Sequence, residues 1–150
     1  MLVSYQEKKH TVSLISSFVI FGIYSWIVYL RYNDANLEGT ELMRTWGAII
    51  LILIPISMVA RIIIEIAFVI GNRIATKEKE PTFADELDKL IELKAMRVSY
   101  FAFIIGFLLA MGSLVMDMKP SAMFVILFLS GFLSEAVGIV WRLYLYRKGV

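Results

Sequence analysis

The stretch WGAIILILIPISMVARIIIEIAFVI, residues 46–70, decides the fold class of this chain. At a rise of about 1.5 Å per residue, a helix of this length crosses a hydrocarbon core of about 30 Å. Backbone polar groups inside a bilayer must bond within their own segment, and this run lacks the alternating polarity of a barrel strand. The stretch therefore predicts a transmembrane helix.

Three further apolar runs lie on either side of this stretch, at 12–30, 98–116 and 122–141. The chain of 150 residues is 59% apolar and 19% charged, against about 45–50% and about 25% in soluble domains. The sequence thus predicts an all-α membrane protein, a bundle of four transmembrane helices in a single domain over 1–150. The long loop lies at 71–97.

The first run follows Lys8 and Lys9 and has some features of a signal sequence. However, it is as long as a full span, and it ends in Trp26 and Tyr29 rather than in small residues that a peptidase cleaves. We therefore expect a retained first helix.

Positive charges predict the orientation. Eleven of the fifteen Lys and Arg residues lie in the N-terminal segment, the 71–97 loop and the C-terminal tail, whereas the other two loops hold three. By the positive-inside rule, both termini and the 71–97 loop are cytoplasmic. The expected location is the cytoplasmic (cell) membrane, with the lipid bilayer as the first partner.

The long loop predicts an amphipathic cytoplasmic helix that leads into the third span. Thr82 can cap it after Pro81, and acidic residues in the first turn complement the helix dipole. This segment could equally serve as a docking surface for a cytosolic protein, through Asp85, Glu86, Asp88, Lys94 and Arg97.

Charged residues also lie inside or at the edge of the second and fourth spans. Arg61 and Glu65 share one helix face, as do Glu135 and Arg142. Taking 1.5 Å per residue from the span centres, Arg61 and Glu135 each lie about 4–5 Å to the cytoplasmic side of the midplane. Charges in lipid normally pair and face the bundle, so we expect Arg61 to meet Glu135 and Glu65 to meet Arg142 if the second and fourth spans are neighbours.

Two interpretations of this cluster stay open. Pro55 and Ser57 lie one to two turns outward of Arg61, and Pro55 frees a backbone carbonyl where a polar cavity can form. The functional interpretation is a hydrated pocket that binds an ion, a proton or a small solute through Arg61, Glu65, Glu135, Arg142 and Ser57. The structural interpretation is an ion-pair cluster that fixes helix register.

Small residues recur every four positions on two spans, at Ala102, Gly106 and Ala110 and at Ser130, Ser134 and Gly138. Such ridges allow close helix contact. We favour packing within one chain, and a homodimer interface is the alternative. Ser13, Ser16, Ser17 and Ser25 of the first span either line a polar path or serve as ordinary helix contacts.

Several function classes are disfavoured. The chain has no Cys, and its single His is His10, so metal sites and cofactors are not expected. No phosphate-binding or dinucleotide motif appears, and we expect no enzyme activity. A net charge of +2 gives no reason to expect a nucleic-acid partner.

Residues 85–100 read DELDKLIELKAMRVSY. The pattern D-E-x-D-x-x-I-x-x-K-A-x-R-x-S-Y before a transmembrane helix resembles a segment of small prokaryotic membrane proteins of unknown function. The resemblance covers these 16 residues and the hydropathy of the rest. It implies a prokaryotic cytoplasmic membrane and no particular reaction.

Two hypotheses about function follow. The first is a transporter or channel component, working as a dimer, whose charged cluster binds the solute or proton. The second is a membrane regulator, immunity factor or assembly protein that acts through the helix of the 71–97 loop.

Overall fold

The computed structural model describes residues 4–77 and 86–149, which form four helices. They are α1 (Tyr5–Tyr32), α2 (Gly39–Thr76), α3 (Glu86–Val115) and α4 (Pro120–Lys148). Each is long and apolar enough to cross a membrane, which confirms the predicted all-α bundle of four candidate spans. The expected cap at Thr82 and the residue Asp85 lie outside the described residues.

The helices extend beyond the apolar runs that predicted them. α1 begins at Tyr5 because Ser4 and Glu7 form a capping box, in which each side chain accepts a hydrogen bond from the other residue's backbone N–H. α2 contains 38 residues against the expected 46–70. α3 runs from Glu86 through the third apolar run without a break, so residues 86–97 belong to the same helix as the span.

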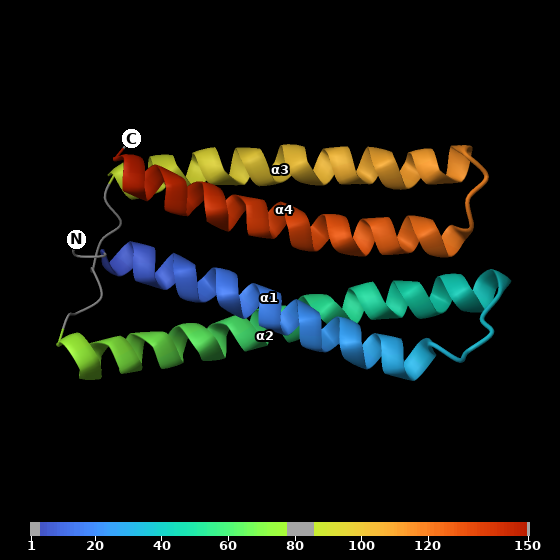
Figure 1. Ribbon diagram of the computed structural model, residues 1–150, viewed down its shortest axis with the longest axis horizontal. Helices are drawn as coiled ribbons and strands as arrows, with labels where there is room; N and C mark the ends of the chain where they lie inside the picture. The colour runs from blue at the N-terminus through green and yellow to red at the C-terminus, as the bar shows by residue number, and fades with distance from the viewer. Residues whose placement is uncertain (1–3, 78–85, 150) are drawn as a thin grey trace.

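The four helices form two antiparallel hairpins (Figure 1). The start of α1, the end of α2, the start of α3 and the end of α4 lie at one end of the bundle, which we call the terminal end. The short α1–α2 and α3–α4 connections lie at the other end. α4 packs against all three other helices, whereas within the described residues the backbone of α3 comes close to α4 alone.

Small residues hold α3 and α4 together. A Cβ atom on Gly106 would collide with the Ser130 side chain, and one on Gly138 would collide with the Ser99 hydroxyl. Ala95 and Ala110 are also fully buried. The predicted small-residue ridges of the third and fourth spans therefore pack within one chain, because only small side chains let two backbones approach this closely.

Aromatic side chains fill the contact between α1 and α4. The rings of Phe21 and Phe132 stack with centroids 4.1 Å apart, and Phe18 meets Phe132 edge-on at 5.0 Å. Tyr24 of α1 donates a hydrogen bond to the backbone carbonyl of Ile49 in α2. These contacts fix α1 between its two neighbours.

Large apolar side chains cover the outside of the bundle. Leu51 is 69% exposed, and Leu30 and Leu109 are each 63% exposed. A soluble monomer rarely exposes apolar surface on this scale, whereas lipid tails solvate it well. The surface and the four candidate spans together indicate a multi-pass membrane protein.

Candidate functional site

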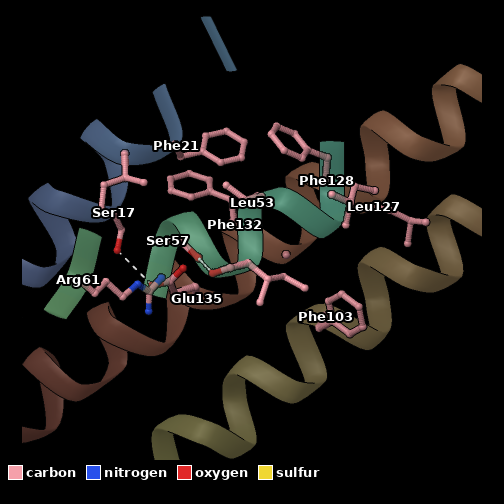
Figure 2. Close-up of a pocket in the computed structure, with 14 residues that line it drawn as sticks. Ser17, Phe21, Leu53, Ser57, Arg61, Phe103, Leu127, Phe128, Phe132 and Glu135 are labelled. Atoms are coloured by element: carbon pink, nitrogen blue, oxygen red, sulfur yellow. Dashed lines mark hydrogen bonds and ion pairs between the residues drawn. The ribbon is translucent and has the colours of Figure 1, made fainter. Parts of the chain in front are cut away.

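An ion pair between Arg61 of α2 and Glu135 of α4 lies in the middle of the bundle. Ser17 of α1 donates a hydrogen bond of 3.2 Å to Glu135 Oε1, so three helices meet at one carboxylate. Figure 2 shows the Arg61 and Glu135 side chains pointing toward each other, with Ser17 above them. The expected meeting of Arg61 and Glu135 is present.

The pair lies far from either end of the bundle. Glu135 is fifteen residues from the start of α4 and thirteen from its end, which places it about 20 Å along the helix from both. A span of about 30 Å of hydrocarbon centred on the helix would therefore enclose the pair. Charged groups at this depth are costly, which is why they pair.

An apolar cavity of about 370 Å³ borders the ion pair, and its lining from α4 precedes Glu135 in the helix, on the side away from the terminal end. Its wall is largely aromatic and aliphatic, and includes Phe21, Phe128 and Phe132, which gather on one side in Figure 2. The polar residues of the lining are Ser17, Ser57, Arg61 and Glu135. An apolar chamber with a few polar groups is the usual composition of a small-molecule site.

Ser57, which was predicted as a binding residue, lines this apolar cavity. Its hydroxyl donates a hydrogen bond of 2.9 Å to the backbone carbonyl of Ile54. The hydroxyl oxygen keeps acceptor capacity. Ser57 and the Arg61–Glu135 pair therefore line the same chamber.

A second cavity, of about 410 Å³, is polar and lies toward the terminal end, where its lining includes Gln6 of α1 and Tyr146 of α4. Its lining includes four cationic side chains, Lys9, Arg61, Lys89 and Arg142, and three acidic ones, Glu65, Asp88 and Glu92. Ser13 and Ser16 line this cavity too, so two of the four serines noted in the first span border a polar space. We call it the polar cavity.

The expected contact between Glu65 and Arg142 is not formed. Glu65 pairs instead with Lys9 of α1 at 2.5 Å, and Arg142 Nη2 pairs with Glu92 Oε1 of α3 at 3.1 Å. The reason is the packing order: α4 packs extensively on α3, whereas α2 meets α1 more closely than it meets α4. Both predicted residues nevertheless line the polar cavity.

Arg61 connects the two spaces, because its side chain lines both the apolar and the polar cavity. It is 43% exposed and Glu135 is 27% exposed, so neither side chain is fully enclosed by the described residues. The polar cavity and the apolar cavity therefore adjoin each other at the Arg61 guanidinium, in the middle of the bundle.

The residues predicted to dock a partner lie on the first turns of α3. Glu86 and Arg97 are exposed, and Lys94 is half-buried. Asp88 is half-buried and accepts a hydrogen bond of 2.7 Å from the Tyr146 hydroxyl of α4. Asp85 lies outside the described residues. Asp88 therefore takes part in the contact between α3 and α4.

Sequence reasoning did not single out Lys9, Glu92 and Tyr146 as site residues. Each lies near a helix end, where charged and aromatic residues are expected as interface anchors, so nothing in the one-dimensional pattern distinguishes them. Phe21 and Phe132 likewise look like ordinary apolar span residues. The spacing of Phe21 and Ser17 places them one helical turn apart, but it does not predict that Phe21 contacts Phe132.

Fold and site together define a four-helix, multi-pass membrane protein with an ion pair at mid-bundle. Comparison with protein-family models, curated proteins and solved structures finds no match to this chain. The resemblance of residues 85–100 to small prokaryotic membrane proteins accordingly stays a prediction.

Proposed function

We propose that this protein is a small membrane transporter, or a component of a channel, that uses the Arg61–Glu135 pair to bind its solute or a proton. The observation that carries the proposal is that Arg61 lines both a polar cavity at the terminal end and an apolar cavity at mid-bundle. A purely structural ion pair needs no such access. Ionisable groups inside spans are by default candidates for a transport path.

The orientation belongs to the same proposal. With most Lys and Arg residues at the terminal end, both termini face the cytoplasm and the polar cavity opens to it. The resemblance of residues 85–100 adds that this membrane is a prokaryotic cytoplasmic membrane. Because four helices enclose little space, we propose that two copies work together.

The alternative is a regulator, immunity factor or assembly protein that docks a cytosolic partner through the start of α3. One observation bears against this alternative: Asp88, one of the predicted docking residues, is engaged with Tyr146 of α4. Docking predicts that charge reversals at Asp85, Glu86 and Asp88 abolish function. Transport predicts that Glu135→Gln and Arg61→Ala abolish it.

The test exploits the absence of Cys from the chain, which makes any introduced Cys the sole labelling site. Ser13→Cys reports on the polar cavity, Ser57→Cys reports on the apolar cavity, and Leu51→Cys, on the exposed outer surface, is the lipid-facing control. A membrane-impermeant thiol reagent is applied from each side of oriented vesicles. Transport predicts labelling of Ser13→Cys from the cytoplasmic side and of Ser57→Cys from at least one side, with none of Leu51→Cys.

A flux measurement completes the test. Vesicles containing the purified protein and an internal pH-sensitive dye are given a pH gradient, and proton entry is followed. We expect entry with the wild type and none with Glu135→Gln. Unlabelled Ser57→Cys together with unchanged proton entry in Glu135→Gln would contradict the proposal.

A further inference from the structure

The two members of the central ion pair differ in how they can respond to a ligand. An arginine keeps its proton under all ordinary conditions, whereas a glutamate in an apolar environment readily takes one up. A cation that displaced Arg61 from Glu135 would leave an unpaired guanidinium at mid-bundle. An anion that displaced Glu135 from Arg61 would leave a carboxylate, and this group can be neutralised by protonation.

Charge balance therefore favours an anion over a cation. Without ligand the pair carries no net charge. With a monoanion on Arg61 and a proton on Glu135, the site again carries no net charge, so the costly burial of a charge in lipid is avoided. The proton comes from water through the polar cavity, which Arg61 also lines.

The neighbouring cavity indicates the rest of the ligand. It is about 370 Å³, and Phe21, Phe128 and Phe132 supply much of its wall. This is near the lower end of the range for small-molecule pockets and suits one apolar chain. A two-chain phospholipid fits poorly, because its headgroup lies at the membrane surface whereas Glu135 is about 20 Å along α4 from either end.

We propose that this chamber binds a free single-chain amphiphile with one negative charge, whose head replaces Glu135 on Arg61 while Glu135 takes up a proton. The apolar chain lies in the apolar cavity, and the Ser17 hydroxyl, now next to a neutral carboxyl group, keeps its hydrogen bond to Glu135. This inference rests on the proposed function and names the substrate class of the same site. The amphiphile and the proton then move together, without net charge.

Most other charged groups on the polar-cavity side of Glu135 have their own partners, and Lys89 and the imidazole of His10 also line that cavity. Arg61 of α2 is the charged side chain in contact with the carboxylate, and α1 contributes Ser17. Further along the polar cavity, Lys9 and Glu65 pair across α1 and α2, and Arg142 and Glu92 pair across α4 and α3. From α3, the side chain that reaches the apolar cavity is Phe103, which carries no charge. Glu135 is thus the acid best placed to couple a proton to ligand on Arg61.

The test uses the full chain in a neutral detergent and decanesulfonate as the probe. A sulfonate does not titrate near neutral pH, so any proton uptake comes from the protein. Calorimetric titrations at pH 7 in two buffers of different protonation enthalpy, corrected with empty micelles, give the number of protons bound per ligand. We expect about one, with an affinity that falls by about tenfold per pH unit as pH rises, because binding is linked to one proton.

Variants separate the roles of the two residues. Glu135→Gln mimics the protonated acid, so it should still bind decanesulfonate, without proton uptake and without pH dependence. Arg61→Ala removes a charge-assisted hydrogen bond and should weaken binding by about 10- to 100-fold. Glu41→Gln, in the exposed first turn of α2 and outside the lining of both cavities, is the matched control and should keep the proton coupling of the wild type. Decyltrimethylammonium, with the same chain length and opposite charge, should bind at least tenfold more weakly, in keeping with a charge-assisted contact.

The wild-type data alone decide the proposal if a variant fails to fold. Binding of decanesulfonate without proton uptake, or equal binding of decyltrimethylammonium, would overturn it. Proton-coupled binding in a protein that shows no proton flux even with decanesulfonate present, and no labelling of Ser57→Cys, would retain the amphiphile site and reject transport. Proton flux without decanesulfonate binding would retain transport and reject the amphiphile site.

Discussion

Arg61 has a different environment on each side: a polar cavity toward the terminal end and an apolar chamber with Glu135 on the other side. Its single guanidinium is therefore both a structural tie between α2 and α4 and a group that a ligand can reach. The two roles make different demands on stability. An ion pair that only joins two helices can be replaced by apolar residues with little loss of stability, whereas replacing a ligand-binding group abolishes binding.

The first prediction tests this separation. Glu135→Leu alone leaves Arg61 without its counter-ion and should destabilise the protein by up to about 2.5–3.5 kcal/mol. Arg61→Leu with Glu135→Leu removes both charges, so most of that stability should return. Thermal unfolding in detergent measures both. If the double variant is stable and still active in the proton-flux assay, the pair is structural.

A second prediction concerns Tyr146, whose hydroxyl donates to Asp88 at 2.7 Å and whose ring stacks on His10 at 5.4 Å. Tyr146→Phe keeps the ring and removes the hydrogen bond to a charged acceptor, which should cost about 1.5–3 kcal/mol. Tyr144→Phe is the control, because Tyr144 is 49% exposed. Equal melting temperatures for the two variants would show that the hydrogen bond does not stabilise the start of α3.

At the scale of elements, the α3–α4 hairpin is the most closely packed part of the molecule. Gly106 lies against Ser130, and Gly138 lies against Ser99, so the two backbones approach at two levels. The contact between α1 and α4 is instead made of rings, Phe21 on Phe132. Small residues permit close approach and rings fill wider gaps, so α4 presents a different surface to each neighbour.

The third prediction follows from the position of Gly106. A leucine there would overlap the Ser130 side chain, and overpacking of this kind costs about 1–3 kcal/mol. Gly112→Leu on the same helix is the matched control, because a Cβ at Gly112 meets nothing within 4 Å. Thermal midpoints in detergent should fall for Gly106→Leu and stay near the wild type for Gly112→Leu. A loss of similar size in both would indicate a general effect of leucine on α3.

The elements were predictable from the sequence because membrane spans obey a strong local rule. The run at 46–70 must be a helix whatever its neighbours are, since lipid offers its backbone no partner. The meeting of Arg61 and Glu135 was predictable from their matching depth, on the condition that the second and fourth spans are neighbours, which the structure satisfies. The partners of Glu65 and Arg142 were not, because they depend on the order in which helices pack, and hydropathy contains no information about that order. The ring cluster around Phe21 and Phe132 could not be predicted for the same reason.

At the scale of the whole molecule, the arrangement of charge is uneven. The ion pairs Lys9–Glu65, Arg142–Glu92 and Glu7–Arg147 all lie toward the terminal end. The other end has two short connections at 33–38 and 116–119. Because every helix is longer than the bilayer core is thick, the charged turns can extend into the headgroup region while the apolar turns remain in lipid.

The last prediction is the orientation that this asymmetry sets. Single Cys residues at Ala35 and Ser121 probe the connecting end, and those at Ser4 and Lys77 probe the terminal end. If the termini are cytoplasmic, an impermeant thiol reagent added to intact cells should label Ala35→Cys and Ser121→Cys, and should label the other two only after permeabilisation. The same asymmetry predicts that neutralising Lys8 and Lys9 while adding lysines at 34–36 yields a mixed orientation, because the first hairpin then loses its charge bias. Labelling of Ser4→Cys in intact cells expressing the unmodified charges would place the polar cavity on the outside, and the proton for Glu135 would then have to enter from that side.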